Sequence, residues 1–331
     1  MTDSEYFTQT TCGEGLSKEA EAYISKIAPN YAENMSAAIV EAIGGNGKRL
    51  NILRSLRLIK TPHLDGLNRI DAEIPSGAFQ IRARLYIPDS RSKVRIPALL
   101  YLHGGGWTIG AIESCELFCQ KFALEAECAV CAIDYRLAPE HKHPAAEEDS
   151  LAAFEWILEN AEKFGINPDC VFVGGDSAGG HLSAAVADAR IKAGKNPPRG
   201  LLMYYPVTAM NDCGNDESYK LYARGYALDA LLMDAFFDAY IPHNQRRAAS
   251  PENYSTLPQF PPTLILTSGF DILRDQGRRF ADKLAQAGAK TRHVELAGAT
   301  HIYLTMPGMD EAFNRALGEG AQFLKRTSRT K

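Results

Sequence analysis

The sequence contains no apolar run that approaches the roughly 20 residues a membrane-spanning helix needs. It carries no basic stripe either, and its formal net charge of −4 argues against a nucleic-acid partner. The first residues, Met1-Thr2-Asp3-Ser4-Glu5, are polar and acidic and lack the basic and apolar regions of a signal peptide. We therefore expect a cytoplasmic protein without a transmembrane segment.

Cysteine is scarce and shows no pairing pattern. There are seven cysteines, an odd number, at Cys12, Cys115, Cys119, Cys128, Cys131, Cys170 and Cys213. A metal site or a redox motif needs matched pairs with further ligands, or a pair at the start of a helix, and neither is present. We expect buried, reduced thiols that serve as small apolar side chains.

Two further segments resemble ligand sites without completing them. The string 44–48 reads Gly-Gly-Asn-Gly-Lys, but a phosphate-binding loop would have Gly at Ala42 and Ser or Thr at Arg49. We interpret it as a helix end followed by a mobile loop. His141 and His143 lie near two glutamates, but nothing in the sequence fixes a metal geometry there. The sequence thus predicts no metal and no cofactor.

Strand-like and helix-like patterns alternate from about residue 70 to the end of the chain. Eight strands are expected, at 72–75, 78–87, 96–103, 129–134, 170–174, 201–205, 262–267 and 291–296. The first two read as a hairpin, and the later ones are near-continuous apolar runs, which are typical of a parallel sheet covered on both faces. Residues 1–60 read as helices, one of them capped by Ser17. The pattern predicts an α/β fold.

A Gly-x-Ser-x-Gly unit, Gly175 to Gly179, stands between the apolar run 170–173 and a helix-like pattern. This is the context of a nucleophile elbow, a sharp turn that lifts the hydroxyl of Ser177 to the end of the sheet. Its glycines let the turn approach neighbouring backbone closely. The motif is short and also occurs in ordinary glycine-rich turns, so partners elsewhere in the chain decide between the two interpretations.

A serine hydroxyl needs an adjacent base to become a nucleophile. On such an elbow the chain order is serine, then acid, then histidine, which leaves only the histidines after the later strands. His301 stands just past the end of strand 291–296, where catalytic groups of parallel sheets gather. His293 lies within that strand. We predict His301 as the base.

The same rule selects the acid. Asp271 follows strand 262–267, at the sheet edge where the base is expected. Asp275 is the rival, but it falls in the first turn of the next helix, where a carboxylate serves to stabilise the helix end. The predicted triad is Ser177, Asp271 and His301.

An acyl-transfer intermediate carries an oxyanion that needs preorganised N–H donors. The glycine-rich segment His103-Gly104-Gly105-Gly106-Trp107 follows a strand and is expected to face the elbow. We predict the amides of Gly104 and Gly105 as donors, together with that of Ala178. The alternative is a flexible glycine turn. His103 precedes the serine, so we expect it to hold the glycine loop in shape by hydrogen bonds.

With these motifs, the chain resembles the hormone-sensitive-lipase-like group of α/β-hydrolases, which includes many bacterial carboxylesterases (family IV). The matching segments are His103–Trp107, Asp134-Tyr135-Arg136-Leu137-Ala138-Pro139-Glu140, Gly175–Gly180, Asp271-Ile272-Leu273-Arg274-Asp275 and His301. The resemblance implies a mostly parallel eight-stranded sheet flanked by helices. It also implies a helical cap built from residues 1–60 and about 208–246, on a catalytic domain of residues 61–331.

The chain departs from the group at a few positions. Ile272 stands where the group usually has Pro, Gln276 where it has Glu, and Ile302-Tyr303 where it often has Gly-Phe. None of these removes a reacting group, so they bear on the shape of the pockets. Candidate pocket walls are aromatic, although core packing explains each equally well: Trp107, Tyr205, Tyr222, Phe236 and Phe237.

The resemblance implies a serine carboxylesterase that hydrolyses short- to medium-chain acyl esters of small molecules. Two alternatives stay open: an amidase or deacetylase that uses the same triad, and a non-catalytic receptor on this scaffold. Plant gibberellin receptors, which resemble the group, lack the catalytic histidine, so His301 favours an enzyme. Homodimers are common in the group, which makes a homodimer a candidate assembly.

Overall fold

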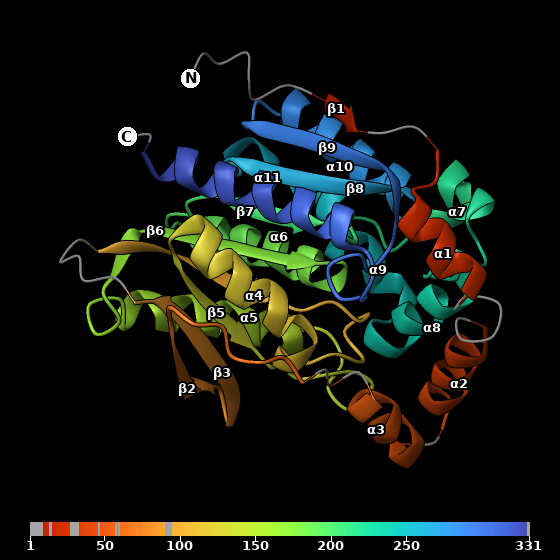
Figure 1. Cartoon of the computed structure of the whole chain (residues 1–331), viewed down its shortest axis with the longest axis horizontal. Helices are drawn as coiled ribbons and strands as arrows, with labels where there is room; N and C mark the ends of the chain where they lie inside the picture. Colours follow the sequence, from red (N-terminus) through yellow and green to blue (C-terminus); the bar gives the residue numbers. More distant parts are fainter. Residues whose placement is uncertain are drawn as a thin grey trace.

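The computed structural model describes residues 9–12, 15–26, 33–45, 47–56, 58, 60–89 and 95–329. The polar segment 1–5 lies outside these residues, as does the side chain of Cys12. The described strands form one sheet in the order β1-β9-β8-β7-β6-β4-β5-β3-β2 (Figure 1). Their bounds are β1 Gln9–Cys12, β2 Leu67–Ser76, β3 Phe79–Pro88, β4 Ile96–Leu102, β5 Ala129–Ile133, β6 Ile166–Asp176, β7 Leu201–Tyr204, β8 Thr263–Phe270 and β9 Thr291–Thr300.

The sheet confirms the expected fold class. β3 is antiparallel to both of its neighbours, β2 and β5, whereas the pairs from β5 through β4, β6, β7 and β8 to β9 are parallel. A ninth strand extends the eight expected ones, because β1 pairs in parallel with residues His293–Leu296 of β9. The sequence predicted helices here. The four residues of β1 do not alternate between apolar and polar side chains, so the sequence did not indicate a strand. They form one because the open edge of the sheet has unpaired N–H and C=O groups with which they can pair.

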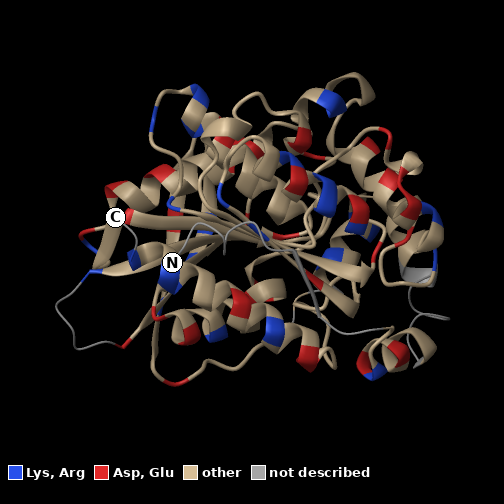
Figure 2. Ribbon diagram, turned by 90° about the horizontal axis from the view of Figure 1, so that it is seen from above, with Lys and Arg blue, Asp and Glu red and all other residues tan. Residues whose placement is uncertain are grey.

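Helices cover both faces of the sheet (Figure 2). Helices α1 (Lys18–Lys26), α4 (Ile112–Ala126) and α11 (Asp310–Arg329) contribute to the apolar core on one face. Helices α5 (Ala145–Glu159), α6 (Ala178–Lys192) and α10 (Arg274–Gln286) contribute to the core on the other face. Basic and acidic residues are mixed over the molecule (Figure 2), although α5 carries acidic residues only. None of the helices among the described residues is long and apolar enough to cross a membrane.

The central strands are apolar throughout because alternate side chains enter different cores. In β4, Leu99 and Tyr101 join the core that contains α4, whereas Leu100 and Leu102 join the core that contains α5 and α6. All four are fully buried. This two-sided burial is what the continuous apolar runs of the sequence indicate, and it holds the carboxyl ends of the parallel strands in a fixed row.

Residues 1–60 do not form a single unit. Helices α2 (Glu33–Ile43), α3 (Gly47–Leu56) and α8 (Ala230–Tyr240) lie together at the lower right of Figure 1, and α2 packs on both α3 and α8. In contrast, β1 and α1 lie against β9. The capping role predicted for Ser17 is confirmed, because its Oγ accepts the N–H of Ala20 at 3.1 Å.

We expected a mobile loop after Gly44-Gly45, and this prediction is wrong for Gly47 and Lys48. Helix α2 ends at Ile43, Gly44 and Gly45 form a turn, and Gly47 and Lys48 already belong to α3. The sequence signal failed because glycine opens α3 despite its low helix propensity, and the packing of α2 on α3 compensates for it. This turn folds α3 back towards the sheet.

Candidate active site

Ser177 stands between the end of β6 at Asp176 and the start of α6 at Ala178, with φ 54° and ψ −115°. Its N–H donates to the carbonyl of Tyr204 at 2.9 Å, and its own carbonyl accepts the N–H of Val207 at 3.1 Å. A Cβ atom on Gly179 would overlap the carbonyl oxygen of Leu102, so β4 passes directly against the turn. The positive φ of a serine is strained, at about 1–3 kcal/mol, and neighbouring strands hold it in place.

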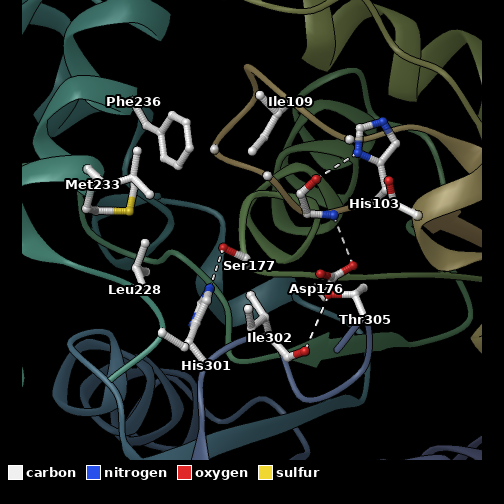
Figure 3. Close-up of a pocket in the computed structure, with 17 residues that line it drawn as sticks. His103, Ile109, Asp176, Ser177, Leu228, Met233, Phe236, His301, Ile302 and Thr305 are labelled. Atoms are coloured by element: carbon white, nitrogen blue, oxygen red, sulfur yellow. Dashed lines mark hydrogen bonds between the residues drawn. The ribbon is translucent and has the colours of Figure 1, made fainter. Parts of the chain in front are cut away.

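The structure brings the three predicted triad residues together (Figure 3). His301 Nε2 lies 3.0 Å from Ser177 Oγ, and His301 Nδ1 lies 2.6 Å from Asp271 Oδ2. All three side chains are buried. The second carboxylate oxygen of Asp271 accepts the N–H of Leu273 at 2.9 Å, which orients the carboxylate. The arrangement has the donor–acceptor order of a nucleophile, a base and an orienting acid.

Asp275, the rival acid, lies elsewhere. Its carboxylate accepts Arg274 Nε at 2.8 Å and the N–H of Ser218 at 2.7 Å. Burial works to raise the pKa of Asp275, but these hydrogen bonds outweigh it and lower the pKa below its usual value. Asp275 therefore links α10 to helix α7 (Glu217–Leu221) as a charged group, whereas the carboxylate beside His301 is that of Asp271.

The prediction of which backbone N–H groups would bind an oxyanion needs one correction. The N–H of Gly104 donates to Asp176 Oδ1 at 3.0 Å, so it is not free to bind a substrate oxygen. The amides of Gly105, Gly106 and Ala178 have no acceptor in the part of the chain that the structure describes. Gly105 and Gly106 line the same cavity as Ser177. Gly106 therefore replaces Gly104 as a candidate donor.

Sequence reasoning missed Asp176, although it lies inside the elbow motif. Its buried carboxylate also accepts the hydroxyls of Tyr101 at 2.9 Å and Tyr205 at 3.4 Å. Burial raises the pKa of Asp176 above its usual value, although the hydrogen bonds from Tyr101 and Gly104 oppose this. The carboxylate ties the elbow to the first residue of the glycine loop.

The glycine loop is held from two further sides. His103 Nδ1 lies 2.8 Å from the carbonyl of Gly104, and its ring stacks on Tyr135 with centroids 4.2 Å apart. Tyr135 Oη donates to the carbonyl of His103 at 2.8 Å, and the N–H of Ala138 donates to the carbonyl of Trp107 at 2.8 Å. The segment Asp134–Glu140 thus supports the loop through polar contacts.

Trp107 and Tyr205 do not line the cavity. Trp107 is fully buried and stacks on Tyr240 at 4.4 Å, while Tyr205 packs against the His301 ring at 4.6 Å. Both are core residues beneath the site, because the chain turns inward after the glycine loop and after β7. Tyr222 and Phe237 also face other aromatic rings, whereas Phe236 lines the cavity.

The cavity beside Ser177 is small, about 50 Å³, and its walls are mostly apolar. Figure 3 shows Leu228, Met233 and Phe236 on one side of Ser177 and Ile109 and Ile302 on the other. The sequence signal for this wall was the spacing of Leu232, Met233 and Phe236, which places them on one face of α8. Without the fold, nothing in the sequence indicated which surface that face covers.

A larger groove of about 340 Å³ adjoins this cavity. The two spaces share Ser114 and Thr305. The groove lies between α4 and the segment that follows His301, and its other lining residues are Thr61, Glu113, Leu117, Lys121, Leu304, Met306, Pro307, Gly308, Met309, Asp310 and Phe313. The groove therefore adjoins the cavity at Ser114 and Thr305.

Gln276 and Ile302, which depart from the family pattern, differ in whether they line the cavity. Gln276 Oε1 accepts the N–H groups of Thr208 at 2.7 Å and Ala209 at 2.9 Å, so it holds the segment after β7 and does not enter the cavity. Ile302 lines the cavity with φ 62°, a backbone conformation that β-branched residues seldom adopt. Ile302 therefore shapes the cavity wall beside His301.

No metal-binding cluster of His, Cys, Asp or Glu occurs among the described residues. His143 Nδ1 lies 3.1 Å from Glu147 Oε1, and His181 Nε2 lies 3.7 Å from the same oxygen. His181 Nδ1 accepts Trp107 Nε1–H at 3.3 Å, and Nε2 donates to the carbonyl of Ala249 at 3.1 Å. These two bonds assign the neutral tautomer of His181, which links the residue after the glycine loop to α6. The six cysteines whose side chains are described are free and buried.

We expect His181 to make stability depend on pH. Burial lowers its pKa to about 4 from the ordinary 6.5. Between pH 6.5 and 4 the unfolded chain binds a proton that the native chain does not, so the free energy of unfolding falls as pH falls, by about 2 kcal/mol at pH 4.5. Urea unfolding at pH 7 and 4.5 should show a smaller loss for His181→Gln than for wild type. The exposed His243→Gln control should keep the wild-type loss; equal losses in all three would contradict the assignment.

Comparison with known proteins agrees with this geometry. Residues 99–305 match the family described as alpha/beta hydrolase fold. The chain is 38% identical over 246 residues to carboxylic ester hydrolase LipN of Mycobacterium tuberculosis, covering 71% of this chain and 64% of LipN. It is 34% identical over 256 residues to carboxylesterase NlhH of the same organism, covering 76% of this chain and 79% of NlhH.

A solved structure is similar over almost the whole chain. Ester-hydrolase EH1AB1, from the metagenome of Lake Arreo, has a TM-score of 0.83 and 31% identity, covering 95% of this chain and 100% of that one. That structure is complexed with a derivative of bipyridine phosphonate. The family match spans more than half of the chain, and NlhH is similar over most of both lengths. The chain therefore belongs to the α/β-hydrolase fold family, in its hormone-sensitive-lipase-like group.

Proposed function

We propose that the protein is a serine carboxylesterase that hydrolyses short- to medium-chain esters through an acyl-enzyme. The observation that carries the proposal is the hydrogen-bonded chain from Ser177 Oγ through His301 to Asp271. The names of the relatives, which are ester hydrolases, favour an ester over an amide substrate. The proposed reaction needs no cofactor.

In the first half-reaction, Ser177 Oγ attacks the ester carbonyl while His301 Nε2, 3.0 Å away, takes its proton. The imidazole becomes a cation, which the Asp271 carboxylate at 2.6 Å stabilises. The carbonyl oxygen becomes an oxyanion, for which we propose the amides of Gly105, Gly106 and Ala178 as donors. His301 then protonates the departing alcohol, and the acyl group stays on Ser177.

In the second half-reaction, His301 removes a proton from water, and the hydroxide attacks the acyl carbonyl. The bond to Ser177 Oγ then breaks, His301 returns the proton to Oγ, and the carboxylic acid leaves. The amide of Ala178 is well suited to both oxyanions, because it is the first N–H of helix α6 and lies at the positive end of the helix dipole. A missing donor of this kind raises the barrier by about 3 kcal/mol.

We further propose that helices α2, α3 and α8 act as a cap that limits the acyl group. The small cavity is walled by Leu228, Met233 and Phe236, and two of these belong to α8. Each buried methylene contributes about 0.8 kcal/mol until the cavity is full. Longer chains must displace the wall, so preference for short to medium acyl groups follows.

Enlarging the wall should move this preference. In a p-nitrophenyl ester series from acetate to decanoate, Phe236→Ala should raise kcat/KM for octanoate relative to acetate by about tenfold, because space for roughly two methylenes opens. Leu231→Ala is the matched control, because that side chain lies on the same helix but is 61% exposed. An unchanged profile in Phe236→Ala, or an equal shift in both variants, would refute the assignment of the acyl wall to α8.

A further inference from the structure

Arg54, in α3, reaches from the N-terminal helices to the glycine loop. Its Nε donates to the carbonyl of Thr108 at 2.8 Å, and its Nη2 donates to the carbonyl of Ala138 at 2.8 Å. Both acceptors belong to fully buried residues. Thr108 follows the glycines of the loop by two positions, and Ala138 belongs to the segment that supports the loop.

The remaining donors of Arg54 are also used. Nη1 and Nη2 form a bidentate pair with the Glu140 carboxylate at 2.9 and 2.8 Å, and Nη1 also donates to Asn51 Oδ1 at 2.9 Å. A guanidinium has five N–H donors in a fixed fork, so this set of acceptors saturates it. The hydrogen bond from Arg54 lowers the pKa of Glu140 below its usual value, which keeps the pair charged. A lysine, with three donors on one atom, cannot span these acceptors.

The acceptors connect directly to the proposed oxyanion donors. The N–H groups of Thr108 and Ile109 both donate to the carbonyl of Gly105, at 3.1 and 3.0 Å. Thr108 Oγ1 donates to the carbonyl of Gly106 at 2.9 Å. The turn after the glycines is therefore hydrogen-bonded to Gly105 and Gly106 within the loop and to Arg54 of α3 outside it.

We propose that Arg54 is a positioning residue, which docks α3 on the glycine loop and thereby keeps the amides of Gly105 and Gly106 aimed at the substrate oxygen. This inference rests on the proposed esterase function. It assigns the N-terminal helices a part in transition-state stabilisation as well as in covering the pocket. Glycine adopts positive and negative φ about equally readily, so contacts from outside the loop must select the values found at Gly105 (115°) and Gly106 (58°).

The test compares Arg54→Lys and Arg54→Met with wild type on p-nitrophenyl acetate, at a temperature well below the unfolding transition of every variant. Loss of alignment should lower kcat by about 10- to 100-fold and leave KM within about threefold, because the amides act on the transition state. A trifluoromethyl ketone inhibitor, which forms a tetrahedral oxyanion adduct with a serine, should weaken in parallel with kcat. Lysine should not rescue, although it keeps the charge.

Arg49→Met is the control on the same helix, because Arg49 forms an ion pair with Glu41 of α2. It should keep wild-type kcat. Glu140→Gln, which leaves the two carbonyl contacts of Arg54 in place, should lose less than Arg54→Lys. A kcat within about twofold of wild type in both Arg54 variants, or a lower kcat with an unchanged inhibitor constant, would overturn the inference.

The same series separates this inference from the proposed function. If wild type hydrolyses the ester and Arg54 variants keep its kcat, only the role of Arg54 fails. If wild type lacks esterase activity, the proposed function itself fails, and the inference falls with it.

Discussion

Replacing Ser177 with alanine should lower kcat for p-nitrophenyl butyrate by about 10⁴- to 10⁶-fold, because triad residues act as a unit and no other group can form the acyl-enzyme. The remaining rate should stay above that in water, because the proposed oxyanion donors, the amides of Gly105, Gly106 and Ala178, are unchanged. Steady-state hydrolysis followed at 405 nm measures the loss. Thermal unfolding should change little, because the substitution removes one hydroxyl.

Ser150→Ala is the matched control for this substitution. Ser150 is also a buried serine, and its hydroxyl donates to the carbonyl of Ala146 at 2.7 Å in its own helix. It should keep the wild-type kcat. Equal activity of Ser177→Ala and wild type would show that another group is the nucleophile.

Asp271→Asn should lower kcat by about 10⁴-fold, the second-largest effect that we expect. The amide keeps the shape of the carboxylate but can neither hold the imidazole in the required tautomer nor stabilise its cation. Because His301 Nδ1 lies only 2.6 Å from Asp271 Oδ2, the two groups are in direct contact and the effect should appear in kcat more than in KM. Kinetics with the same ester over a pH series should show the loss reduced at high pH, where hydroxide can assist deprotonation of the serine.

Asp275→Asn provides the comparison within the same segment. Asp275 interacts with Arg274 and Ser218, so its substitution should cost stability of about 1–2 kcal/mol and leave kcat within a few fold. A larger loss of kcat in Asp275→Asn than in Asp271→Asn would reverse the assignment of the acid.

The sequence alone allowed us to predict which three side chains would lie together as a triad. Chain order and the positions of Asp271 and His301 just past apolar strands were sufficient, because carboxyl ends of parallel strands meet at one edge of the sheet. The hydrogen-bonded contacts of Ser177, Asp271 and His301 agree with that reasoning. These residues follow strands whose two-sided burial makes them easy to recognise in a sequence.

The glycine loop shows where sequence reasoning stops. Three consecutive glycines give no sign of which amides stay free, and the answer depends on Asp176, which takes the N–H of Gly104. Trp107 and Tyr205 failed as pocket walls for a related reason: aromatic residues next to a site either line it or pack beneath it, and only the turn of the backbone decides. Arg54 lies 54 residues before Thr108 and 84 residues before Ala138, so no local pattern could identify these contacts.

The cap is the least predictable part. The family resemblance implied residues 1–60 as a whole, whereas β1 and α1 lie against β9. Edge pairing by a short polar strand depends on a free sheet edge elsewhere in the fold. The cytoplasmic location and the homodimer stay predictions.

The most direct test of the account is the site of covalent modification. Wild type incubated with a p-nitrophenyl alkylphosphonate should lose activity with the release of one equivalent of p-nitrophenol per chain. Intact-mass and peptide mass spectrometry should then find the phosphonyl group on Ser177, and Ser177→Ala should stay unmodified. A fully active protein after prolonged incubation, or an adduct at any other residue with Ser177 unmodified, would contradict the claim that Ser177 is the nucleophile.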